Sequence, residues 1–213
     1  MDISLPTVVV AVLGIPETII GFLKYLLLLN MAKLKSDTKE RLYQEAISKI
    51  KPEPEWYIVL ETLYKMFDNW IFCGLYMRSE YTFKEKTFFG FGKTKYTEGL
   101  ELMDTTHKSD KIPCNNISMD GVCGQSIKSG KVIIVPDVSK FPGHIECDPN
   151  AKSEIALPIM QMVSFESHIP YLIFVLDVDS KEKNDFDEID EKYLREIIQL
   201  VADYIKKPYA IGN

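Results

Sequence analysis

The stretch 170-PYLIFVLDVDS-180 decides the fold, together with 154-EIALPIMQMV-163, which precedes it by a short loop. Both are rich in Val, Ile, Leu and Met or Phe, which is typical of strands that are covered by other parts of a protein. Each run is short enough for a strand and is bounded by polar residues. We expect these two runs to be the strongest strands of a sheet.

Helices and further strands are expected on both sides of these two runs. The order of helices, strands, a short helix, strands and a closing helix predicts an α+β fold, with a mainly antiparallel sheet and helices on one face. The polar segment 92–110 has no clear period and is expected to be a loop. The expected helices cover about 35–50, 55–67, 120–131 and 186–206, and the further strands cover about 70–79, 81–91 and 131–138.

Composition excludes several classes of protein. The chain has 213 residues, enough for one domain with a buried core. Its formal net charge is -6 and its lysines are interleaved with acids, so no nucleic-acid partner is expected. Four cysteines in a chain of this length do not make a disulfide scaffold. The N-terminus lacks the basic residues of a secretory signal, so we expect a cytoplasmic protein.

The first thirty residues form an apolar extension, 1–30, ahead of a domain expected at 31–213. The segment from Leu5 to Leu29 is long enough for a membrane helix, but Pro16, Glu17 and Lys24 interrupt it. Three interpretations stay open. The extension is a membrane or interfacial anchor, or a pair of helices that packs on a partner, or it is absent because translation begins at Met31.

Cys123 is the first candidate for chemistry. It lies between Gly121-Val122 and Gly124, where glycines permit a tight turn and a close approach to another group. It also falls at the expected start of a short helix, a position that lowers the pKa of a thiol. A small apolar residue between two turn glycines is the alternative interpretation.

Cys147 is the second candidate, because it lies in the long loop 142–153, and loops of that length often carry function. Glu146 and Asp148 flank it, and their charges disfavour the thiolate. A protonated His144 could offset them if it lay close to the sulfur. From residue types alone, an incidental loop thiol is equally consistent with the sequence.

Asp177 and Asp179 are two residues apart at the end of an apolar strand, so they point to the same face of the sheet. Neighbouring carboxylates repel, and one of them can hold its proton near neutral pH. Such a pair can bind an ammonium group or act as a general acid. Glu154, which opens the neighbouring strand, could join them. Solvated acids at a strand end are the alternative.

A metal site is not expected from the spacing of the soft ligands. Structural zinc sites usually bring their cysteines in closely spaced pairs. Cys114 and Cys123 are far apart by that standard, and only His144 and Cys147 are close along the chain.

These patches together resemble the free methionine-(R)-sulfoxide reductases, which are built on a GAF domain. The resemblance runs from about Gly121 to Leu200, and it is weaker before that. The segments that carry it are Gly121-Val122-Cys123-Gly124, 135-VPDVSKFPGHIECD-148, 153-SEIALPI-159, 175-VLDVDS-180 and 186-FDEIDEKYL-194.

The resemblance implies an activity and a role for each matching residue. Cys147 is implied as the nucleophile that attacks free methionine sulfoxide, and Cys123 as the thiol that forms the recycling disulfide. Glu154, Asp177 and Asp179 match acids of the substrate pocket, with Asp179 expected to take part in catalysis. A thioredoxin-type protein is the implied reductant, with no metal or organic cofactor, and GAF analogy favours a homodimer.

Three departures from the family pattern matter. Cys114, a further redox candidate, is one position out of register with the family's upstream cysteine. Trp70 and Tyr76 are candidates for the aromatic wall of the pocket, but their spacing is wider than in the family. Glu146 replaces a small residue. The alternatives to a reductase are a GAF module that senses a small ligand without turnover, and a redox switch built on the cysteine pair.

Overall fold

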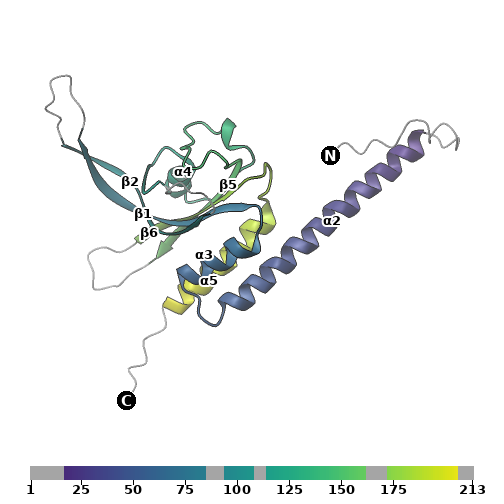
Figure 1. Ribbon diagram of the computed structural model, residues 1–213, viewed down its shortest axis with the longest axis horizontal. Helices are drawn as coiled ribbons and strands as arrows, with labels where there is room; N and C mark the ends of the chain where they lie inside the picture. Colours follow the sequence, from purple (N-terminus) through teal and green to yellow (C-terminus); the bar gives the residue numbers. More distant parts are fainter. Residues whose placement is uncertain (1–16, 85–93, 108–113, 162–171, 206–213) are drawn as a thin grey trace, which may run out of the picture. The chain divides into compact units, whose positions relative to one another are not determined.

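The computed structural model of the chain describes residues 17–84, 94–107, 114–161 and 172–205 (Figure 1). Every candidate site residue falls within these ranges. The elements in chain order are α2 (Glu17–Ile50), α3 (Trp56–Met66), β1 (Trp70–Lys84), β2 (Thr94–His107), β3 (Asn116–Ser118), α4 (Val122–Ser129), β4 (Ile133–Val135), the 3-10 helix η1 (Val138–Lys140), β5 (Ser153–Gln161), β6 (Leu172–Ser180) and α5 (Glu188–Ile205).

The six strands form one sheet in the order β3-β2-β1-β6-β5-β4, and every neighbouring pair is antiparallel. The two apolar runs of the sequence, β5 and β6, are neighbours in this sheet, and both are interior strands, as the expected antiparallel sheet requires. The polar segment predicted as a loop is instead largely β2. It pairs along β1, so cross-strand pairing there overrides a local composition that does not favour a strand.

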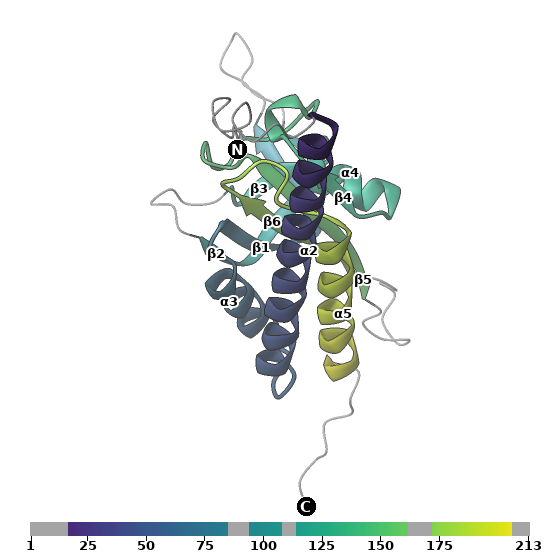
Figure 2. The same ribbon diagram turned by 90° about the vertical axis from the view of Figure 1, so that its right-hand side faces the viewer.

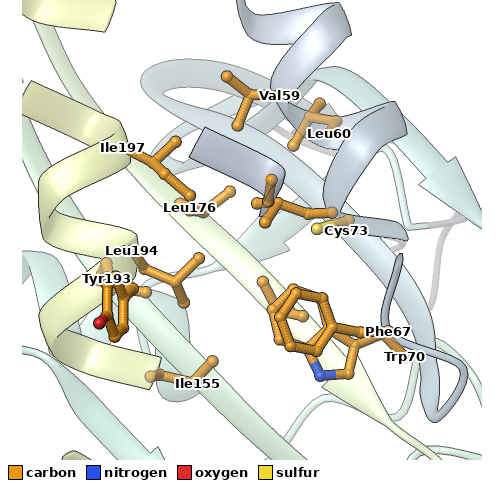
Figure 3. Close-up of a cluster of buried hydrophobic side chains, with 14 of the residues drawn as sticks. Val59, Leu60, Phe67, Trp70, Cys73, Ile155, Leu176, Tyr193, Leu194 and Ile197 are labelled. Atoms are coloured by element: carbon orange, nitrogen blue, oxygen red, sulfur yellow. The ribbon is translucent and has the colours of Figure 1, made fainter. Parts of the chain in front are cut away.

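Helices α3 and α5 share one face of the sheet, which confirms the α+β prediction. Figures 1 and 2 show α3 and α5 on that face and α4 on the opposite one. Side chains of α3 and α5, with Tyr43, Ala46 and Ile50 of α2, pack on Cys73, Ile155 and Leu176 of the strands. Figure 3 shows part of this core, including Phe67 and Trp70. A second, smaller apolar cluster lies between the sheet and α4.

The chain divides into two compact units, Met1–Arg41 and Leu42–Asn213. Helix α2 runs through the division, so the helix expected from about residue 35 begins instead at Glu17. In the first unit, the large apolar side chains between Ile19 and Leu34 are mostly exposed. Among the described residues, no helix combines the length and apolarity that a membrane span requires.

Candidate active site

Three acids meet because strand alternation places them on one face of neighbouring strands. Glu154 on β5 lies directly opposite Asp179 on β6, and Ala156 lies opposite Asp177. Since side chains two apart share a face, all three carboxyl groups point away from the large helical core. Each is buried, with 5 to 8% of its surface exposed. The sequence prediction that Asp177 and Asp179 share a face therefore holds.

Helix α4 brings Cys123 against these acids. Its neighbour Gly124 makes this possible, since a Cβ there would overlap the backbone of Met119. The Cys123 thiol is buried and donates a hydrogen bond to Oε1 of Glu154, with 3.8 Å between sulfur and oxygen. Oδ1 of Asp177 is buried and has no hydrogen-bond partner among the described residues.

Burial decides the protonation of this cluster. It raises the pKa of Glu154 and of Asp179 well above the ordinary range, and in both the charge of Asp177 adds to the effect. It raises the pKa of Asp177 to about 6. Asp177 is therefore the acid of the three that ionises most readily, and burial favours the protonated forms of Glu154 and Asp179.

The expectation of a thiolate at Cys123 is wrong. Burial, followed by the charges of Asp177 and Glu154, raises the pKa of the Cys123 thiol well above its ordinary value. The effect of the helix N-terminus, at most about 2 kcal/mol in partly buried sites, is outweighed by desolvation and by the acids. Cys123 stays a thiol.

Cys147 forms a disulfide with Cys114, with 5.5 Å between their Cα atoms. Cys123 carries a free thiol, so the expected pairing of Cys123 with Cys147 is not the one in the structure. The loop 142–153 brings Cys147 to the segment just before β3, where the hydroxyl of Tyr76 donates to the carbonyl oxygen of Cys114 at 3.0 Å. Cys114, which sequence register left doubtful, is thus beside Cys147.

His144 lies on the same loop, with Nε2 3.6 Å from Oε2 of Glu154. Burial lowers the pKa of His144, and the charge of Glu146 opposes this. The imidazole is therefore neutral near pH 7. It does not supply the positive charge that could offset the acids beside Cys147.

The aromatic candidates separate onto two faces of the sheet. Tyr76 is buried on the face of the acids, whereas Trp70 packs with Phe67 and Tyr43 in the helical core. An even spacing would put Trp70 and Tyr76 on one face, but the pairing of β1 with β6 shifts between Trp70 and Phe72. The prediction of Trp70 as a pocket residue is therefore wrong.

Phe72 lies with Tyr76 on the face of the acids, with 6.2 Å between ring centroids. Gly74, between them, leaves room for the ring of Phe72, which a Cβ at that position would overlap. The sequence contained one signal for this residue, because Phe72 is four positions before Tyr76 in the same strand.

A pocket with about 390 Å³ of empty space brings most of the candidates together. Its wall adds His144, Asp148 and the apolar residues Ile117, Val122 and Ile145, which sequence reasoning did not select as wall residues. The candidates that line it are Tyr76, Cys123, Cys147, Glu154, Asp177 and Asp179. The pocket is thus acidic on one side, apolar on another, and closed in part by the disulfide.

An antiparallel six-stranded sheet with its long helices on one face and a pocket on the other defines a GAF domain. No protein-family model matches the chain. The chain is 44% identical over 110 residues to GAF domain-containing protein A of Dictyostelium discoideum. This match covers 48% of this chain and 65% of that protein.

Two further similarities narrow the class. The chain is 37% identical over 92 residues to the free methionine-R-sulfoxide reductase of Saccharomyces cerevisiae, covering 43% of this chain and 48% of that protein. The crystal structure of the Neisseria meningitidis free methionine-R-sulfoxide reductase with its substrate is similar at a TM-score of 0.56 and 26% identity, covering 79% and 89% of the two chains. The chain is thus similar in sequence and in fold to free methionine-R-sulfoxide reductases. The matches span roughly half to two thirds of the length of these two curated relatives.

Proposed function

We propose that the protein reduces free methionine-(R)-sulfoxide to methionine in the cytoplasm. One observation carries the proposal: Cys147, bonded to Cys114, lies in the same pocket as three buried carboxyl groups. A thiol pair beside acids that hold protons is what reduction of a sulfoxide requires. The sulfoxide oxygen must be protonated as sulfur is attacked, and two thiols must supply two electrons.

Binding of the free amino acid follows from the charges in the pocket. Asp177 is ionised near pH 7, and one of its oxygens has no hydrogen-bond partner among the described residues, so it would bind the ammonium group of the substrate. Glu154 lies beside it and would give a second oxygen to that group once the positive charge is bound. The apolar wall, with Tyr76 and Ile117, would contact the methyl end.

The chemical step uses the groups that remain. Cys147 attacks the sulfoxide sulfur while Asp179, whose protonated form burial favours, donates to the sulfoxide oxygen. The oxygen passes to Cys147 as a sulfenic acid, and methionine leaves. The thiol of Cys114 then attacks that sulfur, water leaves, and the disulfide forms. Two thiols are thereby oxidised and one sulfoxide is reduced.

Recycling then needs a dithiol reductant. The disulfide cysteines are half-buried at the edge of the pocket, so a thioredoxin-type protein could reach the pair after a small movement of the loop. Cys114 takes the part that the resemblance had assigned to Cys123. Cys123 instead holds Glu154 by a hydrogen bond.

The direct test is turnover of separated epimers. Purified protein with dithiothreitol is given free methionine sulfoxide, and the two epimers are followed by chromatography. We expect loss of the R epimer alone, and no loss with Cys147→Ser. Cys73→Ala is the matched control, because Cys73 is a thiol on the opposite face of the sheet and its loss should spare turnover. Binding of the sulfoxide without consumption would instead support the ligand-sensing function.

A further inference from the structure

The buried cluster of Cys123, Glu154 and Asp177 has a second chemical capacity beyond proton storage. One donor atom from each side chain, a sulfur and two carboxylate oxygens, lies within 4.8 Å of the others. All three side chains are buried, so they are held in place by the strands and by α4 rather than by solvent. A thiol with two carboxylates is a ligand set for a divalent metal ion.

Asp177 gives an independent indication that this corner accepts a ligand. Its side chain is only 7% exposed, and Oδ1 has no hydrogen-bond partner in the described part of the chain. A buried carboxylate oxygen without a partner is costly, because water is lost and nothing replaces it. Asp177 also lines the pocket, so an ion that entered there would satisfy this oxygen.

His144 lies beside this cluster but is not one of its donors. Its Nε2 lies 3.6 Å from Oε2 of Glu154, and the side chain lines the same pocket. Among the described residues, the donor atoms that lie within 4.8 Å of one another are those of Cys123, Glu154 and Asp177. Three protein ligands with a fourth position left for water are an arrangement that zinc adopts in proteins.

Zinc is the divalent ion that this donor set suits. Zinc bonds at about 2.3 Å to sulfur and about 2.0–2.2 Å to oxygen, so tetrahedral ligands lie roughly 3.4–3.7 Å apart. The sulfur of Cys123 lies 3.8 Å from Oε1 of Glu154, and the three donor atoms lie within 4.8 Å of one another, so binding of zinc would draw them slightly closer together. Calcium and magnesium prefer ligand sets made of oxygen alone, and a thiol in the set disfavours both.

We propose that Cys123, Glu154 and Asp177 bind Zn²⁺ in the pocket. The ion occupies the position that the substrate ammonium takes in the proposed function, so zinc and methionine sulfoxide exclude one another. Only this exclusion rests on the proposed function, since the binding itself does not require turnover.

Cobalt is the probe for the site, because a cobalt–thiolate bond gives an intense near-ultraviolet absorption band that carboxylates do not give. The full chain, with the Cys114–Cys147 disulfide intact, is titrated with Co²⁺ and then with Zn²⁺. We expect one equivalent of cobalt to give the band and zinc to displace it. Cys123→Ser should abolish the band, and Glu154→Gln should weaken zinc binding about tenfold or more.

Cys73→Ala is the control, since Cys73 is the other free thiol and lies in the helical core. It should leave the band unchanged. A wild-type protein without the band, a band that persists in Cys123→Ser, or a band lost in Cys73→Ala would each overturn the proposal. The binding is measured without substrate, so a protein that binds zinc but consumes no sulfoxide refutes only the proposed function.

Discussion

The stability of the folded protein depends on pH through the protonation of the buried acids in the pocket. Asp177, Glu154 and Asp179 all have raised pKa values in the folded state, because burial disfavours their charged forms. A carboxyl group of this kind contributes stability below its unfolded pKa of about 4 and loses it as pH rises through its folded pKa. The folded protein is therefore expected to lose stability between about pH 4 and neutrality.

The substitution Asp177→Asn should remove part of the stability that the folded protein loses as pH rises. Near pH 7.5 we expect the free energy of unfolding of the variant to exceed that of the wild type by on the order of 1–3 kcal/mol, with a smaller gain near pH 4. Denaturant unfolding at the two pH values measures it. Asp120→Asn, which changes an exposed carboxylate, is the control and should stay within about 0.5 kcal/mol at both. A stability of Asp177→Asn that falls with pH as steeply as the wild type would contradict the account.

The disulfide partner of Cys147 could not be fixed from the sequence. Cys114 and Cys123 are both upstream of it, and the choice depends on which of them the fold brings within bonding distance. The resemblance to the reductase family implied Cys123 as the partner. In the fold the glycines around Cys123 serve close packing of α4, which buries Cys123 against Glu154 and leaves Cys114 beside Cys147.

Helix α4 depends on one close contact with the chain before it. A Cβ at Gly124 would overlap the backbone of Met119, which cannot swing aside as a side chain could. Gly124→Ala should thus lower the free energy of unfolding by about 1–3 kcal/mol, although alanine favours a helix over glycine by about 1 kcal/mol. Thermal unfolding measures the loss. Lys128→Ala on the exposed side of α4 is the control, and an unchanged midpoint for Gly124→Ala would show that this contact is not tight.

At the scale of strands and helices, the apolar periodicity was sufficient for β5, β6 and α5. It also placed Glu154, Asp177 and Asp179 on one face, because strand alternation depends only on local geometry. The apolar periodicity did not predict the structure where pairing between segments distant in the sequence determines which residues form a strand and which face they occupy. The register shift in β1 moved Trp70 into the helical core, and pairing with β1 made β2 a strand despite its polar residues.

Across the whole chain, the apolar first part of α2 is the feature that the GAF domain does not explain. Its exposed side chains include Phe22, Leu23, Leu26 and Leu29, and Lys33 and Lys35 follow them. Each fully buried leucine contributes about 1.5–3 kcal/mol, so such a surface has a strong tendency to bind a lipid or protein surface. The lysines would favour an anionic membrane.

We predict that the full chain co-sediments with vesicles of phosphatidylcholine and phosphatidylglycerol. The double variant Leu23→Ser, Leu26→Ser should reduce the bound fraction several-fold, because it removes apolar area from the helix. Tyr57→Ser, which removes an exposed aromatic side chain of α3, is the control. A full chain that stays in the supernatant as a dimer would support packing on a partner, and a cellular product that begins at Met31 would support the third interpretation.

In the proposed reaction Cys147 attacks the free sulfoxide, and Cys114 then forms the disulfide that completes the reduction. The most direct measurement gives the fully reduced protein one equivalent of free methionine-(R)-sulfoxide without any reductant. Methionine is then quantified, and the disulfide is mapped by peptide mass spectrometry. We expect one methionine to form for each protein chain. We also expect the oxidised protein to carry a disulfide between Cys114 and Cys147. Unconsumed sulfoxide, or methionine formed together with a Cys123–Cys147 bond, would contradict the proposed reaction.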